Sequence, residues 1–189
     1  GTPRRWNDGW LTIEEHGNTR SLLFNGAPLS GSDQWVRSLV DVTDSEILYT
    51  ASIDPTTIDL WSVRDGRKEC LTDGNGVVQA VGSQSVTVIE RSSLESSSRV
   101  EVITPENTWG INSWQTTPMV TPAVEFLQTR SSGIHTAVLF PTGYSDELLP
   151  VLLDPHGGPH AQRVLRARNT YLVSQWFADQ GFCVVIADG

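Results

Sequence analysis

The sequence contains a single lysine, Lys68, a single methionine and two cysteines among its 189 residues. It carries 22 acidic residues against 13 basic ones, which gives a net charge of −9. A surface that binds nucleic acid or an anionic membrane needs clustered Lys and Arg, so this balance argues against both as the main partner. In addition, no apolar run reaches the roughly 20 residues that a membrane-spanning helix requires.

The two cysteines, Cys70 and Cys183, are far apart in the sequence and match no metal-ligand pattern. No group of His, Cys and Asp has the spacing of a zinc or calcium site, and no glycine-rich phosphate loop is present. We therefore expect neither a metal nor another cofactor. The chain does not open with the charged and then apolar segments of a signal peptide, which favours a cytoplasmic protein. A processed secreted chain would have the same features.

Seven tryptophans and many Thr and Val residues favour a β-rich fold over a helical bundle. Short apolar or alternating segments follow one another through residues 1–121, separated by turn signals such as Asn25-Gly26 and Asp65-Gly66. The pattern falls into a partial unit and two further units, near residues 27–76 and 77–121. Units of about 45 residues and four strands are typical of β-propeller blades, with a β-sandwich as the alternative.

The pattern changes near residue 121, at two prolines, Pro118 and Pro122, that suit a domain edge. Residues 148–153 are almost wholly apolar, as expected for a strand that is covered on both faces. A helix is predicted next, with Asn169 as its N-cap and Gly181 just past its end. Residues 182–187 form a second apolar strand. The order strand, loop, helix, strand predicts a βαβ unit with a parallel pair of strands.

The segment between the first of these strands and the helix reads Asp-Pro-His-Gly-Gly-Pro-His. The carboxyl ends of parallel strands are where α/β sheets place their ligands. Gly157 and Gly158 leave backbone N–H groups uncovered, and such groups can stabilise a negative oxygen that develops during a reaction. His156 either donates to that oxygen or orders the loop, because the usual order of serine, acid and then histidine excludes it as a triad base. The alternative is a glycine-rich turn with a purely structural role.

Two further residues, His160 and Arg163, are candidates for the substrate groove, with a solvated or ion-paired loop as the alternative for the arginine.

A nucleophile is missing. An α/β-hydrolase needs a Gly-x-Ser-x-Gly elbow, and no serine of the chain stands in that pentapeptide. Cys183 falls in a predicted buried strand, where a thiol is a poor nucleophile.

Residues 151–159 and 176–189 resemble the start of the catalytic domain of the prolyl oligopeptidase family. Upstream, residues 48–52 and 59–63 are similar to the blades of the family's N-terminal propeller, and residues 132–141 resemble its first hydrolase strands. The dipeptidyl-peptidase and acylaminoacyl-peptidase branches carry a similar His-Gly-Gly-Pro loop. In the former branch a tyrosine takes the place of the histidine, so the loop leans toward the acylaminoacyl type.

This resemblance implies the C-terminal part of a β-propeller, residues 1–121, followed by the N-terminal, incomplete part of an α/β-hydrolase catalytic domain, residues 122–189. It further implies a serine peptidase that cleaves short peptides through an acyl-enzyme, with its Ser, Asp and His beyond Gly189. His156, Gly157 and Gly158 would then form the oxyanion side. The implied partners are a short peptide and the remainder of the catalytic domain, from the same or another chain, and a homo-oligomer is left open. A carboxylesterase and a non-catalytic β-rich binding module are the alternatives.

Overall fold

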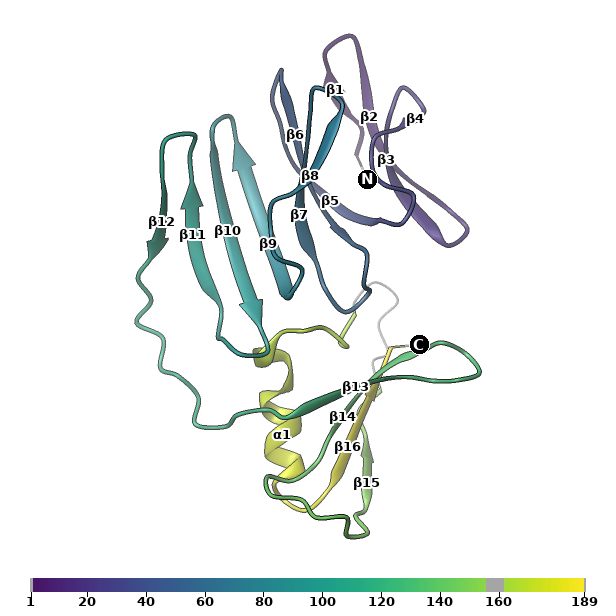
Figure 1. The fold of residues 1–189 in the computed structure, drawn as a ribbon, viewed down its shortest axis with the longest axis vertical. Coiled ribbons are helices and arrows are strands. Elements are labelled where there is room, and N and C mark those ends of the chain that lie inside the picture. Colours follow the sequence, from purple (N-terminus) through teal and green to yellow (C-terminus); the bar gives the residue numbers. More distant parts are fainter. Residues whose placement is uncertain (1, 156–161, 189) are drawn as a thin grey trace. The chain divides into compact units, whose positions relative to one another are not determined.

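The computed structural model describes residues 2–155 and 162–188. It is built mainly of strands, as the composition predicts, and the chain divides into two compact units (Figure 1). The first unit comprises Gly1–Arg91 and Ser98–Ser113, and the second comprises Ser92–Ser97 and Trp114–Gly189. No helix among the described residues is long and apolar enough to cross a membrane.

An 8-stranded sheet occupies most of the first unit and follows the order β1-β2-β3-β5-β6-β7-β8, with β4 beside β3. Strands β3 and β5 meet in parallel at one residue pair, Arg20 and Trp35, so the sheet consists of two successive antiparallel groups. The second group, β5 to β8, has the size of one propeller blade. The strands are β1 (Arg4–Trp6), β2 (Gly9–His16), β3 (Thr19–Phe24), β4 (Ala27–Pro28), β5 (Trp35–Val42), β6 (Glu46–Ser52), β7 (Asp59–Arg64) and β8 (Arg67–Cys70).

Two of the tight turns in this sheet have the backbone that their sequences predict. Asn25 and Gly26 have φ values of 49° and 83°, and Asp65 and Gly66 have φ values of 50° and 72°. Positive φ at both central residues is the requirement of a type I′ turn, which Asn-Gly and Asp-Gly satisfy at least cost. These turns fix the register of the strand pairs that they connect.

A separate 4-stranded antiparallel sheet completes the first unit, with the order β12-β11-β10-β9. One shared apolar cluster joins it to the first sheet, with Val40, Leu48 and Leu60 on one side and Val78 and Ile89 on the other. The sheets therefore stack face to face, as neighbouring blades do. Its strands are β9 (Gly76–Ser83), β10 (Val86–Ser93), β11 (Arg99–Ile103) and β12 (Thr108–Ile111).

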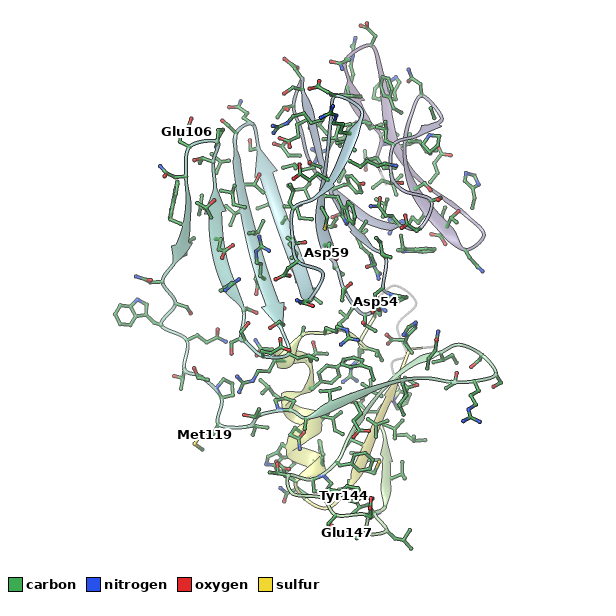
Figure 2. All side chains as sticks on the ribbon, in the orientation of Figure 1. Asp54, Asp59, Glu106, Met119, Tyr144 and Glu147 are labelled. Atoms are coloured by element: carbon green, nitrogen blue, oxygen red, sulfur yellow. The ribbon has the colours of Figure 1, made fainter. Side chains whose placement is uncertain are left out.

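A buried carboxylate closes the end of the β5–β8 group. Asp59, labelled in Figure 2, is 7% exposed and accepts hydrogen bonds from the Thr72 hydroxyl at 2.6 Å and the Gly74 N–H at 3.0 Å. The same hydroxyl accepts the Leu60 N–H at 3.1 Å. The network holds the chain that leaves β8 against the start of β7.

The second unit contains a 4-stranded sheet of order β13-β14-β16-β15. Strands β13, β14 and β16 pair antiparallel, whereas β15 and β16 form the predicted parallel pair. A 3₁₀ turn and a short helix, α1, pack against this sheet, with Tyr171, Ala178 and Ile186 fully buried in its core. The elements are β13 (Val124–Gln128), β14 (His135–Leu139), β15 (Val151–Leu153), the 3₁₀ turn (Arg168–Tyr171), α1 (Leu172–Ala178) and β16 (Cys183–Ala187).

Two details of the sequence prediction for this unit are wrong. The apolar stretch 148–153 forms a strand only over Val151–Leu153, and Val151 and Leu153 are 60% and 68% exposed, because β15 is the edge strand of this sheet. Asn169 is not the helix N-cap. It lies inside the 3₁₀ turn, and Tyr171 occupies the N-cap position without a side-chain hydrogen bond. Gly181 does follow the helix, with a φ of 96°.

Candidate functional site

Two aspartates mark the carboxyl ends of the parallel strands. Asp154 follows β15 directly, and Asp188 follows β16 directly. The Asp154 N–H donates to the carbonyl of Val185 at 2.9 Å and thereby extends the parallel pairing by one residue. Both carboxylates therefore stand at the sheet edge where α/β folds place ligands.

Arg163 joins these strand ends through its side chain. Its Nη1 donates to Asp154 Oδ1 at 2.6 Å, and its Nη2 donates to Asp154 Oδ2 at 2.8 Å. The pair is partly shielded from water, with 27% of the arginine side chain and 37% of the aspartate side chain exposed. The hydrogen bond that the guanidinium donates to the Asp154 carboxylate raises the pKa of Arg163, which keeps the guanidinium charged. Two parallel N–H···O bonds are the strongest and most directional form of such a pair.

The backbone of the same segment is held by Asp188. The Arg163 N–H donates to Asp188 Oδ1 and the Val164 N–H donates to Asp188 Oδ2, both at 2.9 Å. The buried hydroxyl of Tyr171 accepts the next N–H, that of Leu165, at 2.9 Å and donates to the Arg163 carbonyl at 3.3 Å. Three consecutive backbone N–H groups thus have fixed acceptors although the segment is neither helix nor strand.

Of the predicted site residues, only Arg163 falls within the described part of the chain. His156, Gly157, Gly158 and His160 lie outside the described residues, and their roles stay predictions. Arg163 is ion-paired with Asp154, which is the alternative to a role in the substrate groove. Its place in such a groove stays a prediction.

No local pattern in the sequence identifies Asp154 or Asp188 as a partner of this arginine. The available signal was an acidic residue immediately after each of two apolar strands, at positions that a parallel pair brings to one edge. Within residues 2–155 and 162–188, no group of three or more His, Cys, Asp or Glu side chains is arranged to hold a metal ion.

The proline-rich segment before β13 is attached to the second unit. Arg168 Nη2 donates to the carbonyls of Pro118 at 3.3 Å and Val120 at 2.9 Å. The side-chain oxygen of Gln175, a residue only 1% exposed, accepts the Ala123 N–H at 3.0 Å. The amide nitrogen of Gln175 donates to the Phe140 carbonyl, also at 3.0 Å. Residues 118–123 are therefore part of the second unit's framework.

Comparison with known proteins identifies the fold. No protein-family model matches the chain, and no curated protein sequence matches it. Among solved structures, dipeptidyl peptidase 4 of Porphyromonas gingivalis matches 98% of this chain and 30% of its own length, with a TM-score of 0.79 and 17% identity. The acylaminoacyl peptidase of Pyrococcus horikoshii matches 95% of this chain and 30% of its own length, with a TM-score of 0.64 and 12% identity.

The chain has the fold of this part of the two peptidases. The fold class predicted from the sequence is thereby confirmed, and so, at the level of the fold, is the resemblance to dipeptidyl and acylaminoacyl peptidases. The chain spans about 30% of the length of these solved structures. Activity and substrate therefore belong to the proposal that follows.

Proposed function

We propose that the chain is part of a serine peptidase of the prolyl oligopeptidase family, one that hydrolyses short peptides in the manner of a dipeptidyl or acylaminoacyl peptidase. The observation that carries the proposal is the fold shared with two peptidases over nearly the whole chain, in the first unit as well as in the second. In this proposal residues 1–121 are the C-terminal part of a β-propeller. Residues 122–189 are the N-terminal part of an α/β-hydrolase catalytic domain.

The proposed reaction is acyl transfer. A serine attacks the peptide carbonyl, the amine leaves, and water then hydrolyses the acyl-enzyme. The N–H groups around Gly157 and Gly158, with His156, stabilise the negative oxygen of the tetrahedral intermediate, while His160 and Arg163 border the groove that binds the peptide. Because the chain has no Gly-x-Ser-x-Gly elbow, the triad comes from polypeptide outside residues 1–189. No metal or organic cofactor takes part.

The exposed apolar surface of the second unit supports an incomplete domain. Val151 and Leu153 of β15 are 60% and 68% exposed, and Val173 and Trp176 of α1 are 68% and 52% exposed. The outer edge of β15 is unpaired within the described part of the chain, since this strand ends the sheet order. Parallel sheets are normally covered on both faces, so a further parallel strand beside β15 and further helices would bury these side chains.

The proposal is tested by assaying the complete polypeptide that carries this chain. We expect it to release the chromophore from dipeptidyl or acylaminoacyl p-nitroanilides, and a serine-directed phosphonate should abolish the release. Residues 1–189 alone should give no turnover, because they contain no nucleophile elbow. Hydrolysis of simple esters with no cleavage of amides would replace the peptidase by a carboxylesterase. If the complete polypeptide hydrolyses neither amides nor esters, the alternative that stands is a β-rich binding module.

A further inference from the structure

A cavity of about 370 Å³ in the first unit is lined by both of its sheets, and we call it the inter-sheet cavity. Its apolar wall continues the cluster that joins the sheets, with Leu48 and Leu60 on one side and Ile103 on the other. The β9–β10 and β11–β12 turns, at one end of the 4-stranded sheet in Figure 1, complete its rim. Cavities of this volume, with apolar walls and a few polar groups, are typical of sites for small molecules.

Asp41 lines the inter-sheet cavity with a buried carboxylate that has no partner. The residue is 8% exposed, and no described residue donates a hydrogen bond to its side chain or forms an ion pair with it. Asp59 is equally buried, at 7% exposed, but accepts hydrogen bonds from the Thr72 hydroxyl and the Gly74 N–H. Buried polar groups are nearly always paired, because burying an unpaired charge is costly. The Asp41 carboxylate therefore has unused capacity to accept hydrogen bonds from a ligand.

The local structure of β5 directs Asp41 toward the cavity. The pairing of β5 with β6 is irregular between Leu39 and Asp41, where β5 has one extra residue, Val40. As a result two successive side chains lie toward β9, since Val40 belongs to the cluster between the sheets and Asp41 lies against Gly82. A β-bulge is a common means of redirecting a side chain next to a functional site. A Cβ at position 82 would lie 2.7 Å from the Cβ of Asp41, so glycine leaves the room that the carboxylate occupies.

The remaining polar groups leave the negative charge of Asp41 unbalanced. Glu46 pairs with Arg64 at 3.0 Å, so these two charges neutralise each other at the cavity. The Thr87 side chain also faces the cavity, is 9% exposed and has no hydrogen bond to any described residue. The inter-sheet cavity thus combines one unpaired carboxylate, one unpaired hydroxyl and an apolar wall.

We propose that the inter-sheet cavity binds a small aliphatic amine in its ammonium form, with the charged group at Asp41 and the alkyl chain along Leu48 and Leu60. An ammonium group has three N–H donors and no acceptor, which suits a carboxylate beside a hydroxyl. A divalent metal ion needs more acidic ligands, and within residues 2–155 and 162–188 no three His, Cys, Asp or Glu side chains are arranged to hold one. The inference goes beyond the proposed peptidase activity and does not depend on it.

The test measures binding of n-butylammonium chloride to the complete polypeptide by isothermal titration calorimetry. Asp41→Asn keeps the shape of the side chain and removes its charge. We expect the affinity to fall by about 10- to 100-fold, the usual contribution of a hydrogen bond to a charged group. Gly82→Ala retains the carboxylate but displaces it, and should also weaken binding. Asp44→Asn is the matched control, because it removes the same charge from an exposed position between β5 and β6 and should leave the affinity within about twofold.

A second measurement separates ligand binding from folding. Since no described residue donates to the Asp41 carboxylate, Asp41→Asn should not lower the melting temperature of the polypeptide without ligand. n-Butylammonium should raise the melting temperature of the wild type more than that of this variant, because a ligand stabilises the state that binds it. n-Butanol has the same chain without the charge and should bind at least about tenfold more weakly to the wild type. This comparison needs no variant and holds if Asp41→Asn does not fold.

The outcomes distinguish this inference from the proposed function. A wild-type polypeptide that does not bind n-butylammonium, or binds it no better than n-butanol, overturns the amine site while the peptidase assignment stands. Equal affinities of the wild type and Asp41→Asn also overturn it. Binding of Ca²⁺ without binding of the amine would show that the cavity takes another class of cation. A peptidase assay that fails has no bearing on these measurements.

Discussion

Replacing His156 by alanine in the complete polypeptide is expected to slow acylation by about 100-fold while substrate affinity changes by no more than about twofold. Alanine retains the backbone N–H at this position, so the variant removes only the imidazole. If the imidazole donates to the oxyanion or orders the loop, its loss raises the energy of the transition state and not that of the bound substrate. Single-turnover measurement of acyl-enzyme formation reads this step directly.

His16→Ala is the matched control for this variant. His16 is an exposed histidine at the end of β2, where Nε2 lies 3.3 Å from Glu14 Oε2. The control should acylate at the wild-type rate. An unchanged acylation rate in His156→Ala would show that the imidazole has no oxyanion-side role and that the glycine N–H groups suffice.

Replacing Tyr171 by alanine is expected to lower the free energy of unfolding of the second unit by about 4 kcal/mol, because truncating a fully buried aromatic side chain leaves a cavity. The ring is 0% exposed and packs edge-on against Phe126 at 6.2 Å between centroids. The hydroxyl also holds the backbone of Leu165 and Arg163. Hydrogen exchange of the β14 and β16 amides in the complete polypeptide measures the local loss.

Tyr171→Phe removes only the hydroxyl, and with it two hydrogen bonds, and should cost about 2 kcal/mol, because each hydrogen bond has a net value of about 1 kcal/mol. Burial raises the pKa of Tyr171 in the folded state, so the unfolded state loses its proton first. The stability of the second unit should therefore fall as pH rises above 10, the ordinary tyrosine pKa, and Tyr171→Phe should reduce that fall. Tyr49, whose pKa burial raises to about 12, should give the first unit a similar loss of stability in the wild type and in Tyr171→Phe.

Tyr144→Phe, at a half-buried tyrosine, is the control for Tyr171→Ala. Equal hydrogen-exchange protection of the β14 and β16 amides in these two variants would contradict the role of Tyr171.

The blades were predictable because local chemistry determines much of their structure. The type I′ turns at Asn25-Gly26 and Asp65-Gly66 need positive φ at both positions, and these residues supply it. Alternating side chains then assign one face of each strand to the core. Strands β1 and β12 show the limit of this pattern. Arg4–Trp6 is mostly charged, and all four residues of β12 are exposed.

The second unit shows where such patterns stop being informative. The apolar side chains of residues 148–153 indicate a segment suited to burial. How much of β15 is exposed depends instead on which strands and helices lie beside it. The contacts of Arg163 with Asp154 and Asp188 depend on the path of the chain. Arg163 meets Asp154 nine positions away and Asp188 25 positions away, separations that no helical or strand periodicity encodes. The parallel pair was predictable, but the residue that joins its ends was not.

The most direct test of the account is to label the complete polypeptide with a serine-directed fluorophosphonate and to map the modified residue by mass spectrometry. We expect one modified serine, in a Gly-x-Ser-x-Gly elbow outside residues 1–189, and loss of peptidase activity in proportion to labelling. No labelling, or a modified serine within residues 1–189, would contradict it.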